Sequence, residues 1–435
     1  MNRPFEGLYL HIPFCVKRCA YCDFSTNAVP RDSARIDDYL EQLVLSVELA
    51  GRAGLLDRVR TIYIGGGTPS FVGAARLRRL LETVGERVDL SQVVEFTMEA
   101  NPDSFDEEVA STVSRLGVNR FSIGVQSTDD DTLRLLGRVH SGAQALEALR
   151  VAGEYAPNVS ADIICGIMGV PHEPAETSDR VVSAMRARML RSIGDVVAAG
   201  VNHVSVYPLA IEEGTPLERA IEAGDLPDVD EDEQAADMLA AASFLGAVEP
   251  QPFKRYEISN YALPGCESRH NTSYWTGVPY LGLGAGAASM FDASDRDRVL
   301  ESGALAAWGW RGDARDDTTL PGSRTVDSAF PADPALRGGR TRIADCFEES
   351  LTCAQAAAED FMLAMRLAGG IERSRLEVLQ NANPALREAE RSIIQKGLAA
   401  WACSSGHSSS TDCLAPTERG WLLGNEMFAT IWTAG

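Results

Sequence analysis

The chain has 435 residues, of which 45% are hydrophobic and 23% are charged, and its formal net charge is −22. This composition indicates a globular protein with a large core, and the length allows more than one domain. The acidity disfavours nucleic acid and anionic lipid as partners, because no long Lys/Arg run offsets it. No stretch of about 18 apolar residues occurs, so we expect a cytoplasmic protein without a transmembrane segment.

Short β-branched segments recur along the first half of the chain. They predict strands over residues 7–13, 61–67, 93–101, 120–127, 160–167 and 203–210. Amphipathic stretches between these segments predict helices over 33–52, 73–86, 105–116, 141–153 and 175–199. Asp32 or Ser33 can cap the first helix. Strand and helix therefore alternate regularly.

Such alternation implies parallel strand pairing with right-handed crossovers. Six units fit either a doubly wound sheet or an incomplete (β/α) barrel, and both folds place functional residues at the carboxyl ends of the strands. The unusual residues of this chain follow its predicted strands: "HIPFC" follows the first, "GGGTPS" the second, "EANPDS" the third and "GVQS" the fourth. We therefore expect a functional site at that rim.

The pattern changes after about residue 250. Residues 256–290 are rich in Gly and aromatic residues, residues 295–345 are mainly charged and small, and residues 354–435 are mostly of helical pattern. We predict a core over 1–250, a loop and barrel-closing segment over 251–294, a linker or insertion over 295–345, and a helical, winged-helix-like domain over 346–435. Thr417 is placed to cap the last helix.

Cys15, Cys19 and Cys22 form a C-x3-C-x2-C motif. A four-iron cluster held by only three thiolates keeps one iron open to a non-protein ligand. The amine and carboxylate of an amino acid can chelate that iron, and S-adenosylmethionine (SAM) carries both beside a sulfonium that one electron cleaves. Lys17 and Arg18 would favour thiolates and offset an anionic cluster.

Two plainer interpretations fit the spacing alone. The three thiols can lie on a loop without metal, or a distant histidine such as His11 can complete a zinc site. A structural zinc site normally has four ligands in spaced pairs, and no second pair lies nearby. The other six of the nine cysteines are scattered, which fits a reducing compartment rather than a disulfide framework.

The cysteine motif is one of several in a fixed order. "LYLHIPFCVKRCAYCDF" is followed by "GGGTPS", "EANPDS", "FSIGVQS" and "LGRVH". This order resembles the radical SAM superfamily, and specifically the branch of the oxygen-independent coproporphyrinogen III oxidases and the HemW-type haem chaperones. The resemblance runs from about Leu8 to Met290 and resumes weakly in the C-terminal domain. It implies an α/β fold, an incomplete (β/α)6 radical SAM barrel with a smaller, mostly helical C-terminal domain.

The resemblance also implies roles for single residues. Cys15, Cys19 and Cys22 would bind a [4Fe–4S] cluster. The contacts implied for SAM are Tyr9, Tyr21, Gly66, Gly67, Thr68, Glu99, Gln126, Arg138, Asp162 and Ala210. The tyrosines would flank the cofactor, the Gly-Gly-Thr segment would meet its amine, Glu and Gln its ribose, and Arg its carboxylate. Taken singly, these residues also fit a turn, salt bridges or strand-end hydrogen bonds, but they follow different predicted strands.

The resemblance leaves two functions of different classes. The oxidases carry an extra cysteine two positions after the third, where this chain has Phe24, which disfavours oxidative decarboxylation of coproporphyrinogen. "SRHNTSYW" (268–275) matches the H-N-x-x-Y-W segment associated with haem binding in the chaperones. His270 is then the leading haem contact, with Tyr274 and Trp275 as flat apolar surfaces. The plainer interpretation is a loop-anchoring histidine and two packed aromatic rings.

We therefore expect a haem chaperone that passes haem to haem-requiring proteins, respiratory enzymes among them. The resemblance also allows a homodimer. The first alternative is a porphyrinogen dehydrogenase, and the second is another radical enzyme, for which acidity disfavours an RNA substrate. We expect Cys266 to be a buried or idle thiol, although it stands four residues before His270. Cys165 stands where the family usually has an aromatic residue.

Overall fold

The computed structural model describes residues 5–168, 178–305, 340–344, 347–403 and 412–434. The start of the predicted helix 175–199 and most of the predicted linker 295–345 lie outside these ranges. Within them, no helix combines the length and the hydropathy that a membrane crossing requires.

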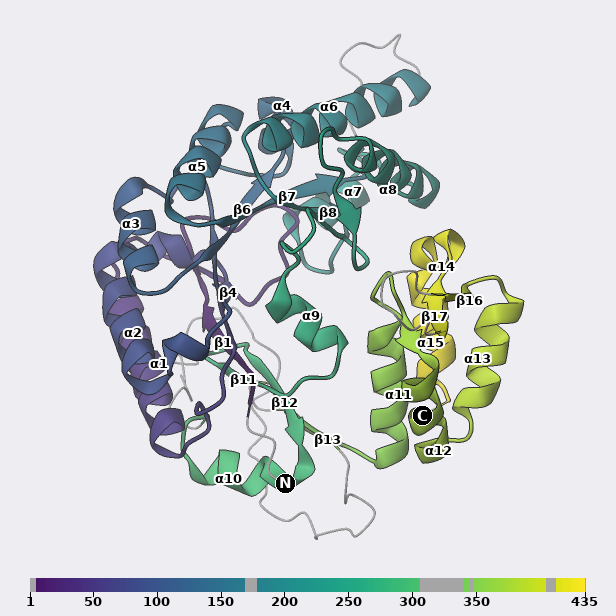
Figure 1. Ribbon diagram of the computed structural model, residues 1–435. Coiled ribbons are helices and arrows are strands. Elements are labelled where there is room, and N and C mark those ends of the chain that lie inside the picture. The colour runs from purple at the N-terminus through teal and green to yellow at the C-terminus, as the bar shows by residue number, and fades with distance from the viewer. Residues whose placement is uncertain (1–4, 169–177, 306–339, 345–346, 404–411, 435) are drawn as a thin grey trace.

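Six parallel strands form the centre of a 12-stranded sheet and pair in chain order. They are β1 (Gly7–Ile12), β4 (Thr61–Gly66), β5 (Glu95–Ala100), β6 (Arg120–Gln126), β7 (Asn158–Cys165) and β8 (His203–Pro208). The connections contain η1 (Pro69–Val72), η2 (Leu90–Gln92), α1 (Ala34–Arg52), α2 (Ala74–Arg87), α3 (Glu107–Arg115), α4 (Asp130–Leu135), α5 (Gly142–Tyr155) and α6 (Ser178–Ala198). Figure 1 shows a curved sheet with an arc of helices around its convex side. A doubly wound sheet would carry helices on both faces, so the expected incomplete barrel is confirmed.

The sheet stays open because both of its edges are extended rather than joined. Beside β1 lie β11 (Tyr280–Leu283), β12 (Ala288–Asp292), β13 (Arg340–Ala344) and β14 (Phe347–Leu351), and beside β8 lie β10 (Asn260–Ala262) and β9 (Lys254–Arg255). Strands of the predicted barrel-closing segment 251–294 thus lengthen the sheet at both edges. β14 pairs antiparallel with β13, so the sheet ends beyond the domain boundary that we placed at residue 345.

Helices α7 (Pro216–Glu222) and α8 (Glu231–Gly246) follow β8, α9 (Arg269–Trp275) precedes β11, and η3 (Ala293–Asp295) and α10 (Arg296–Glu301) follow β12. In Figure 1, α9 lies on the open side, between the sheet and the C-terminal helices. It contacts both β4 and α11 (Cys353–Ala364). The position of α9 bears directly on the predicted haem segment.

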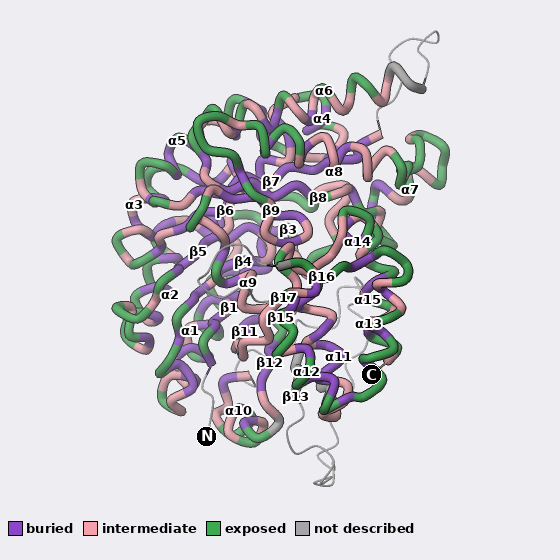
Figure 2. Tube along the Cα trace, turned by 45° about the vertical axis from the view of Figure 1, so that its right-hand side comes forward, coloured by how far each residue is buried: buried purple, intermediate pink, exposed green. Residues whose placement is uncertain are grey.

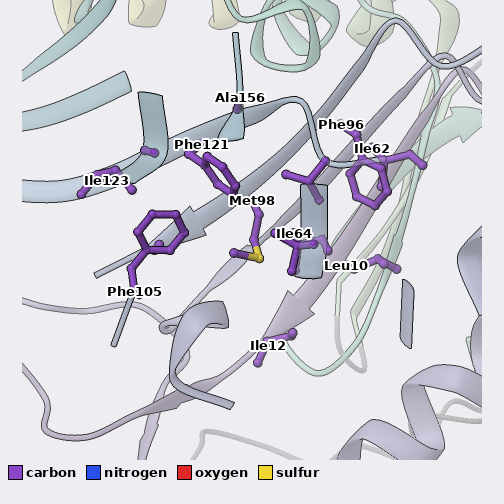
Figure 3. Close-up of a cluster of buried hydrophobic side chains, with 14 of the residues drawn as sticks. Leu10, Ile12, Ile62, Ile64, Phe96, Met98, Phe105, Phe121, Ile123 and Ala156 are labelled. Carbon is purple, nitrogen blue, oxygen red and sulfur yellow. The ribbon is translucent and has the colours of Figure 1, made fainter. Parts of the chain in front are cut away.

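The core lies between the convex face of the sheet and its helices. Figure 3 shows part of it, with Leu10, Ile12, Ile62, Ile64, Phe96, Met98, Phe105, Phe121, Ile123 and Ala156 labelled, all of them buried. Successive side chains of a strand point to opposite faces of the sheet. The residues between these core positions therefore point to the concave face. In Figure 2 the strands are largely buried, whereas α3 and α5 carry many exposed residues.

The C-terminal domain has a core of its own around Phe361, Leu376, Ile393 and Leu414. It comprises α11, α12 (Arg373–Ala382), α13 (Leu386–Gln395), α14 (Glu418–Leu422), α15 (Gly424–Trp432), and a sheet of β15 (Ile371–Glu372), β17 (Asp412–Pro416) and β16 (Ala399–Cys403). Thr417 caps α14, the helix before the last, by accepting a hydrogen bond from the Gly420 amide.

This domain docks on residues 255–276. The Trp421 indole Nε1 donates to the Ile258 carbonyl at 2.7 Å, and Arg255 stacks over the Trp421 ring at 4.3 Å. The Arg375 guanidinium donates to the Thr276 carbonyl at 3.0 Å, just beyond the end of α9. The C-terminal domain therefore covers the segment in which the sequence predicts haem contacts.

Candidate functional site

The three clustered cysteines lie on one loop beyond the carboxyl end of β1. Strands β2 (Phe14–Cys15) and β3 (Asn27–Ala28) pair across the base of this loop, and all three thiols are partly exposed. The Ala20 amide donates to the Leu136 carbonyl at 3.0 Å, which ties the middle of the loop to the end of α4. The sequence motif is thus presented on an anchored loop at the predicted rim.

Glycines at the end of β4 allow this loop to approach closely. Gly66 has φ +118°, and a Cβ there would lie 2.5 Å from the His11 ring. A Cβ on Gly67 would lie 2.8 Å from the Pro13 carbonyl carbon. The next residue, Thr68, places its hydroxyl 3.4 Å from the Cys15 Sγ. Gly66 and Gly67 therefore allow the end of β4 to pack closely against residues 11–14, and Thr68 then reaches the cysteine loop.

Arg138 connects the cysteine loop to two further strand ends. Its Nη1 donates to the Cys19 Sγ at 3.4 Å, and its Nη2 donates to the Asn101 Oδ1 at 2.9 Å and to the Gly124 carbonyl. The Asn101 amide in turn donates to the Thr68 hydroxyl at 2.8 Å. The Arg138 Nε is buried without a hydrogen-bond partner. A cationic group with an unsatisfied donor beside a thiol suits an anionic ligand.

A row of polar side chains crosses the concave face of the sheet, and we call it the polar belt. It consists of Tyr9, Tyr63, Glu99, Ser122, Asp162 and Tyr207, which are exposed in part, Tyr207 to 40%. The Tyr63 hydroxyl donates to the Glu99 Oε1 at 2.7 Å, and the Ser122 hydroxyl lies 3.4 Å from the Asp162 carboxylate. The Tyr9 and Tyr63 ring centroids are 6.1 Å apart.

Sequence reasoning found three members of the polar belt, Tyr9, Glu99 and Asp162, and missed the other three. Tyr63 stands between the buried Ile62 and Ile64, in the second predicted strand. Because side chains alternate along a strand, a residue between two core residues points to the opposite face. This alternation is the sequence signal by which Tyr63 could have been found.

The two carboxyl groups of the belt titrate far above their usual range. Burial raises the pKa of Glu99 to about 7, although hydrogen bonds from Tyr63 and the Gly66 amide favour the carboxylate. Burial likewise raises the pKa of Asp162 to about 6, against hydrogen bonds from Ser205 and Ser122. Near neutral pH, these groups can accept hydrogen bonds from hydroxyls or donate one when protonated.

The remaining predicted contacts differ in how closely they join this site. Gln126, at the end of β6, has φ +64°, and it is the one non-glycine residue with positive φ in the described ranges. Such strain concentrates at functional sites. Tyr21 packs on a small apolar cluster that includes Leu136 and Leu217. Ala210 is exposed beyond β8, and no described hydrogen bond links it to the other site residues.

Three thiols on one loop are a donor set that an iron–sulfur cluster can use. Among the described residues, no three His, Cys, Asp or Glu side chains converge where one metal ion could be held. A cluster binds one thiolate per iron, so its ligands need not meet at a point. His11, the histidine of the zinc alternative, has its ring nitrogens 2.9 Å from the Tyr9 hydroxyl and 3.0 Å from the Ser25 carbonyl.

His270 lies at the opposite, amino ends of the strands, buried between α9 and the concave face of the sheet. It is 0% exposed, with its Nδ1 2.9 Å from the Thr61 hydroxyl and its Nε2 2.7 Å from the Tyr274 hydroxyl. Its ring stacks on Tyr63 at 5.2 Å. Both nitrogens are engaged, so this conformation does not offer His270 to a haem iron. The geometry is that of the anchoring histidine that we considered as the plainer interpretation.

A buried carboxylate, which sequence reasoning missed, holds the start of α9. Glu95, the first residue of β5, accepts hydrogen bonds from the Arg269 and His270 amides at 2.9 Å and from the Ser268 hydroxyl at 3.3 Å. The Arg120 guanidinium donates to the Cys266 carbonyl at 2.9 Å. The amino ends of the strands therefore fix this segment, and Cys266 contributes its backbone.

Replacing His270 by Ala should lower the free energy of unfolding by about 2–4 kcal/mol, because it leaves a cavity and two buried hydroxyls without their partner. Urea unfolding measures this change. Asn271→Ala, on the less buried part of the same helix, is the control and should cost less than about 1 kcal/mol. Equal stability of wild type and the His270 variant would contradict the anchoring role.

Glu99→Gln should change how stability depends on pH. The pKa of Glu99 is about 7 in the folded state and 4.5 in its ordinary, unfolded environment. Between these two pH values the folded state holds a proton that the unfolded state has lost. The stability of wild type therefore falls as the pH rises from 4.5 to about 7. The Gln variant lacks this loss. Its stability relative to wild type should rise by about 3 kcal/mol between about pH 4 and pH 8. The control is Glu82→Gln, at an exposed position of α2. Parallel pH profiles for Glu99→Gln and wild type would contradict the prediction.

Comparison with known proteins confirms the resemblance seen in the sequence. The family model of the Radical SAM superfamily matches residues 9–182. "Heme chaperone HemW" of Mycobacterium tuberculosis is 39% identical over 289 residues, which cover 66% of this chain and 69% of that protein. "Heme chaperone HemW" of Bacillus subtilis is 29% identical over 434 residues, which cover 98% of this chain and 99% of that protein.

Among solved structures, coproporphyrinogen III oxidase (HemN) from Escherichia coli matches with a TM-score of 0.67 and 19% identity. The match covers 99% of this chain and 91% of that chain, and at this identity it shows a shared fold alone. The family itself follows from the sequence relatives: the chain belongs to the HemW-type radical SAM proteins.

Proposed function

We propose that the protein is a haem chaperone, which binds haem and passes it to haem-requiring proteins. The observation that carries the proposal is 39% identity to a protein named "Heme chaperone HemW" over 289 residues. Phe24 supports it, because this ring, 71% exposed, stands where the oxidases carry their extra cysteine. The recipient proteins, respiratory enzymes among them, a homodimer and a cytoplasmic location stay predictions from the sequence.

The proposal includes a [4Fe–4S] cluster on Cys15, Cys19 and Cys22, with one iron left for SAM. Two features support it: the thiols share one anchored loop, and the Arg138 guanidinium beside Cys19 would offset the charge of the cluster. Burial raises the pKa of the Cys15 thiol to about 11, so binding iron would displace its proton. When bound, the cluster supplies one electron to the sulfonium of SAM.

The chain's own residues would orient SAM from several strand ends. Glu99 and Gln126 would bind the ribose hydroxyls, with Glu99 held in place by Tyr63 and the Gly66 amide. Gly66, Gly67 and Thr68 would meet the methionyl amine, and Arg138 its carboxylate. Tyr9 and Tyr21 would flank the cofactor, and Asp162 and Ala210 would line the site. The raised pKa values of Glu99 and Asp162 reflect the partial removal of these two carboxyl groups from water.

The proposal places haem at α9 (Arg269–Trp275). Ligation of its iron by His270 requires the imidazole to leave Thr61 and Tyr274 and become exposed. The Trp275 ring, at the other end of the helix, is partly exposed and can be contacted with His270 in place, although its indole Nε1 is buried. Haem contact at α9 therefore has two modes, one with His270 released and one with His270 in place.

Alanine at Cys15, Cys19 or Cys22 should abolish cluster assembly, since each thiolate would hold one iron. After anaerobic reconstitution, iron, inorganic sulfide and visible charge-transfer absorbance should be lost in each variant. The control is Cys266→Ala, which removes a partly exposed thiol outside the loop. This variant should keep the iron, the inorganic sulfide and the charge-transfer absorbance. Unchanged spectra in the loop variants, or zinc in place of iron and sulfide, would overturn the cluster assignment.

Haem titration of wild type should give a saturable shift of the Soret band with defined stoichiometry. The protein should form no protoporphyrinogen from coproporphyrinogen under reducing anaerobic conditions. Absence of haem binding would refute the chaperone, and porphyrinogen turnover would restore the oxidase. The folded His270→Ala variant separates the two modes of contact. A large loss of haem affinity would show that the imidazole leaves its buried position, and unchanged affinity would show that it stays there.

A further inference from the structure

An arginine of the C-terminal domain lies against the outer end of α9. The guanidinium of Arg366, just after α11, is 4.3 Å from the Trp275 ring centroid and 5.3 Å from that of Phe428 on α15. Trp275 is the last residue of α9. Two aromatic rings from different parts of the chain therefore hold one guanidinium at the seam between α9 and the C-terminal domain.

This guanidinium has no polar partner among the described residues. Its Nε is buried without a hydrogen bond, and no described carboxylate forms an ion pair with it. Glu257 is near enough to attract it, yet the Glu257 carboxylate binds the Ser259 amide at 2.8 Å instead. The indole Nε1 of Trp275 is also buried and unpaired. Two neighbouring donors at this seam thus lack acceptors.

The other two arginines that stack on aromatic rings in the described parts of the chain each have a polar partner. Arg373 lies 3.8 Å from the Trp401 ring and pairs with Asp412 at 3.4 Å. Arg255, over Trp421, donates to the Glu257 carbonyl at 3.1 Å. Stacking alone therefore does not explain why Arg366 is left unpaired.

An unpaired, partly buried charge lowers stability unless an acceptor arrives. A methionine or leucine at position 366 would pack between the rings without this penalty. A guanidinium and an indole N–H offer donors only, so their complement is an anion with two acceptor oxygens in one plane, such as a carboxylate. The aromatic rings provide the flat apolar surface that a macrocycle attached to that carboxylate needs.

We propose that Arg366 and Trp275 form a carboxylate subsite that binds a propionate of haem at the seam between α9 and the C-terminal domain. The inference rests on the proposed haem-binding function and adds to it a specific contact from outside the haem-associated segment. It leaves His270 in its buried position, because a propionate contact at Trp275 does not require the imidazole to move. Haem then touches both domains.

The experiment compares haem with haem dimethyl ester, in which both propionates are blocked. Wild type should bind haem about 10- to 100-fold more tightly than the ester, the range of a hydrogen bond to a charged group. Arg366→Met keeps an unbranched side chain between the rings, and should lose about that factor for haem and less than about threefold for the ester. Trp275→Phe keeps a ring but removes the indole donor, and should show a smaller selective loss.

Arg373→Met is the matched control. Like Arg366, Arg373 belongs to the C-terminal domain and stacks on a tryptophan, Trp401, but it has a carboxylate partner, Asp412. It should bind both compounds as wild type does. Equal affinity of wild type for haem and ester overturns the subsite, even if the Arg366 variant fails to fold. So does an equal loss of both compounds in folded Arg366→Met. A wild type that binds neither compound refutes the haem function itself, which is a different outcome.

Discussion

A single close backbone contact positions the candidate cofactor site. Gly67, beyond the end of β4, packs against Pro13 and Phe14 at a distance that leaves no room for a Cβ, and its amide donates to the Ile12 carbonyl at 2.9 Å. That contact brings Thr68 to Cys15, and from Thr68 hydrogen bonds run through Asn101 to Arg138 and back to Cys19. Three strand ends and the cysteine loop are thus joined in one network. A larger residue at Gly67 would separate the loop from the residues that complete the site.

The carboxyl ends of the barrel strands carry the candidate cofactor site, and their amino ends hold α9. Tyr63 contacts residues at both ends. At the amino ends, buried polar groups hold the segment that leads into α9: His203 lies 2.6 Å from the Ser160 hydroxyl and 2.8 Å from the Tyr256 hydroxyl, which accepts from the Ser268 amide. Tyr63 stacks its ring on His270 and donates its hydroxyl to Glu99. One side chain therefore links the predicted SAM site to the predicted haem segment by direct contact.

The sequence was sufficient for the parts of the fold that depend on local pattern. Strand and helix periodicity predicted the parallel core, and the order of motifs predicted which residues gather at the rim, because parallel strands bring their carboxyl ends together. It was insufficient where a role depends on distant partners. His270 lies in the predicted segment, but its burial depends on Thr61, 209 positions away, and the role of Glu95 depends on amides 174 and 175 positions away. Glu95 begins a strand, and no motif in the adjacent sequence indicates its role. Arg366 likewise lies in a stretch with an ordinary helical pattern.

The seam between α9 and the C-terminal domain differs from either core. The domain packs around its own apolar cluster, and apart from Trp421 and its neighbour Leu422 it contributes no described residue to the cluster of the barrel. Hydrogen bonds to backbone carbonyls and stacked arginines make up much of the remaining contact. Domain interfaces of this polar kind permit relative motion. A ligand held by Trp275 on one side and Arg366 on the other would lose its carboxylate contact when the domains separate, while both cores stay folded. The proposed chaperone function requires that bound haem be released, and a site divided between two domains would combine tight binding with such a release.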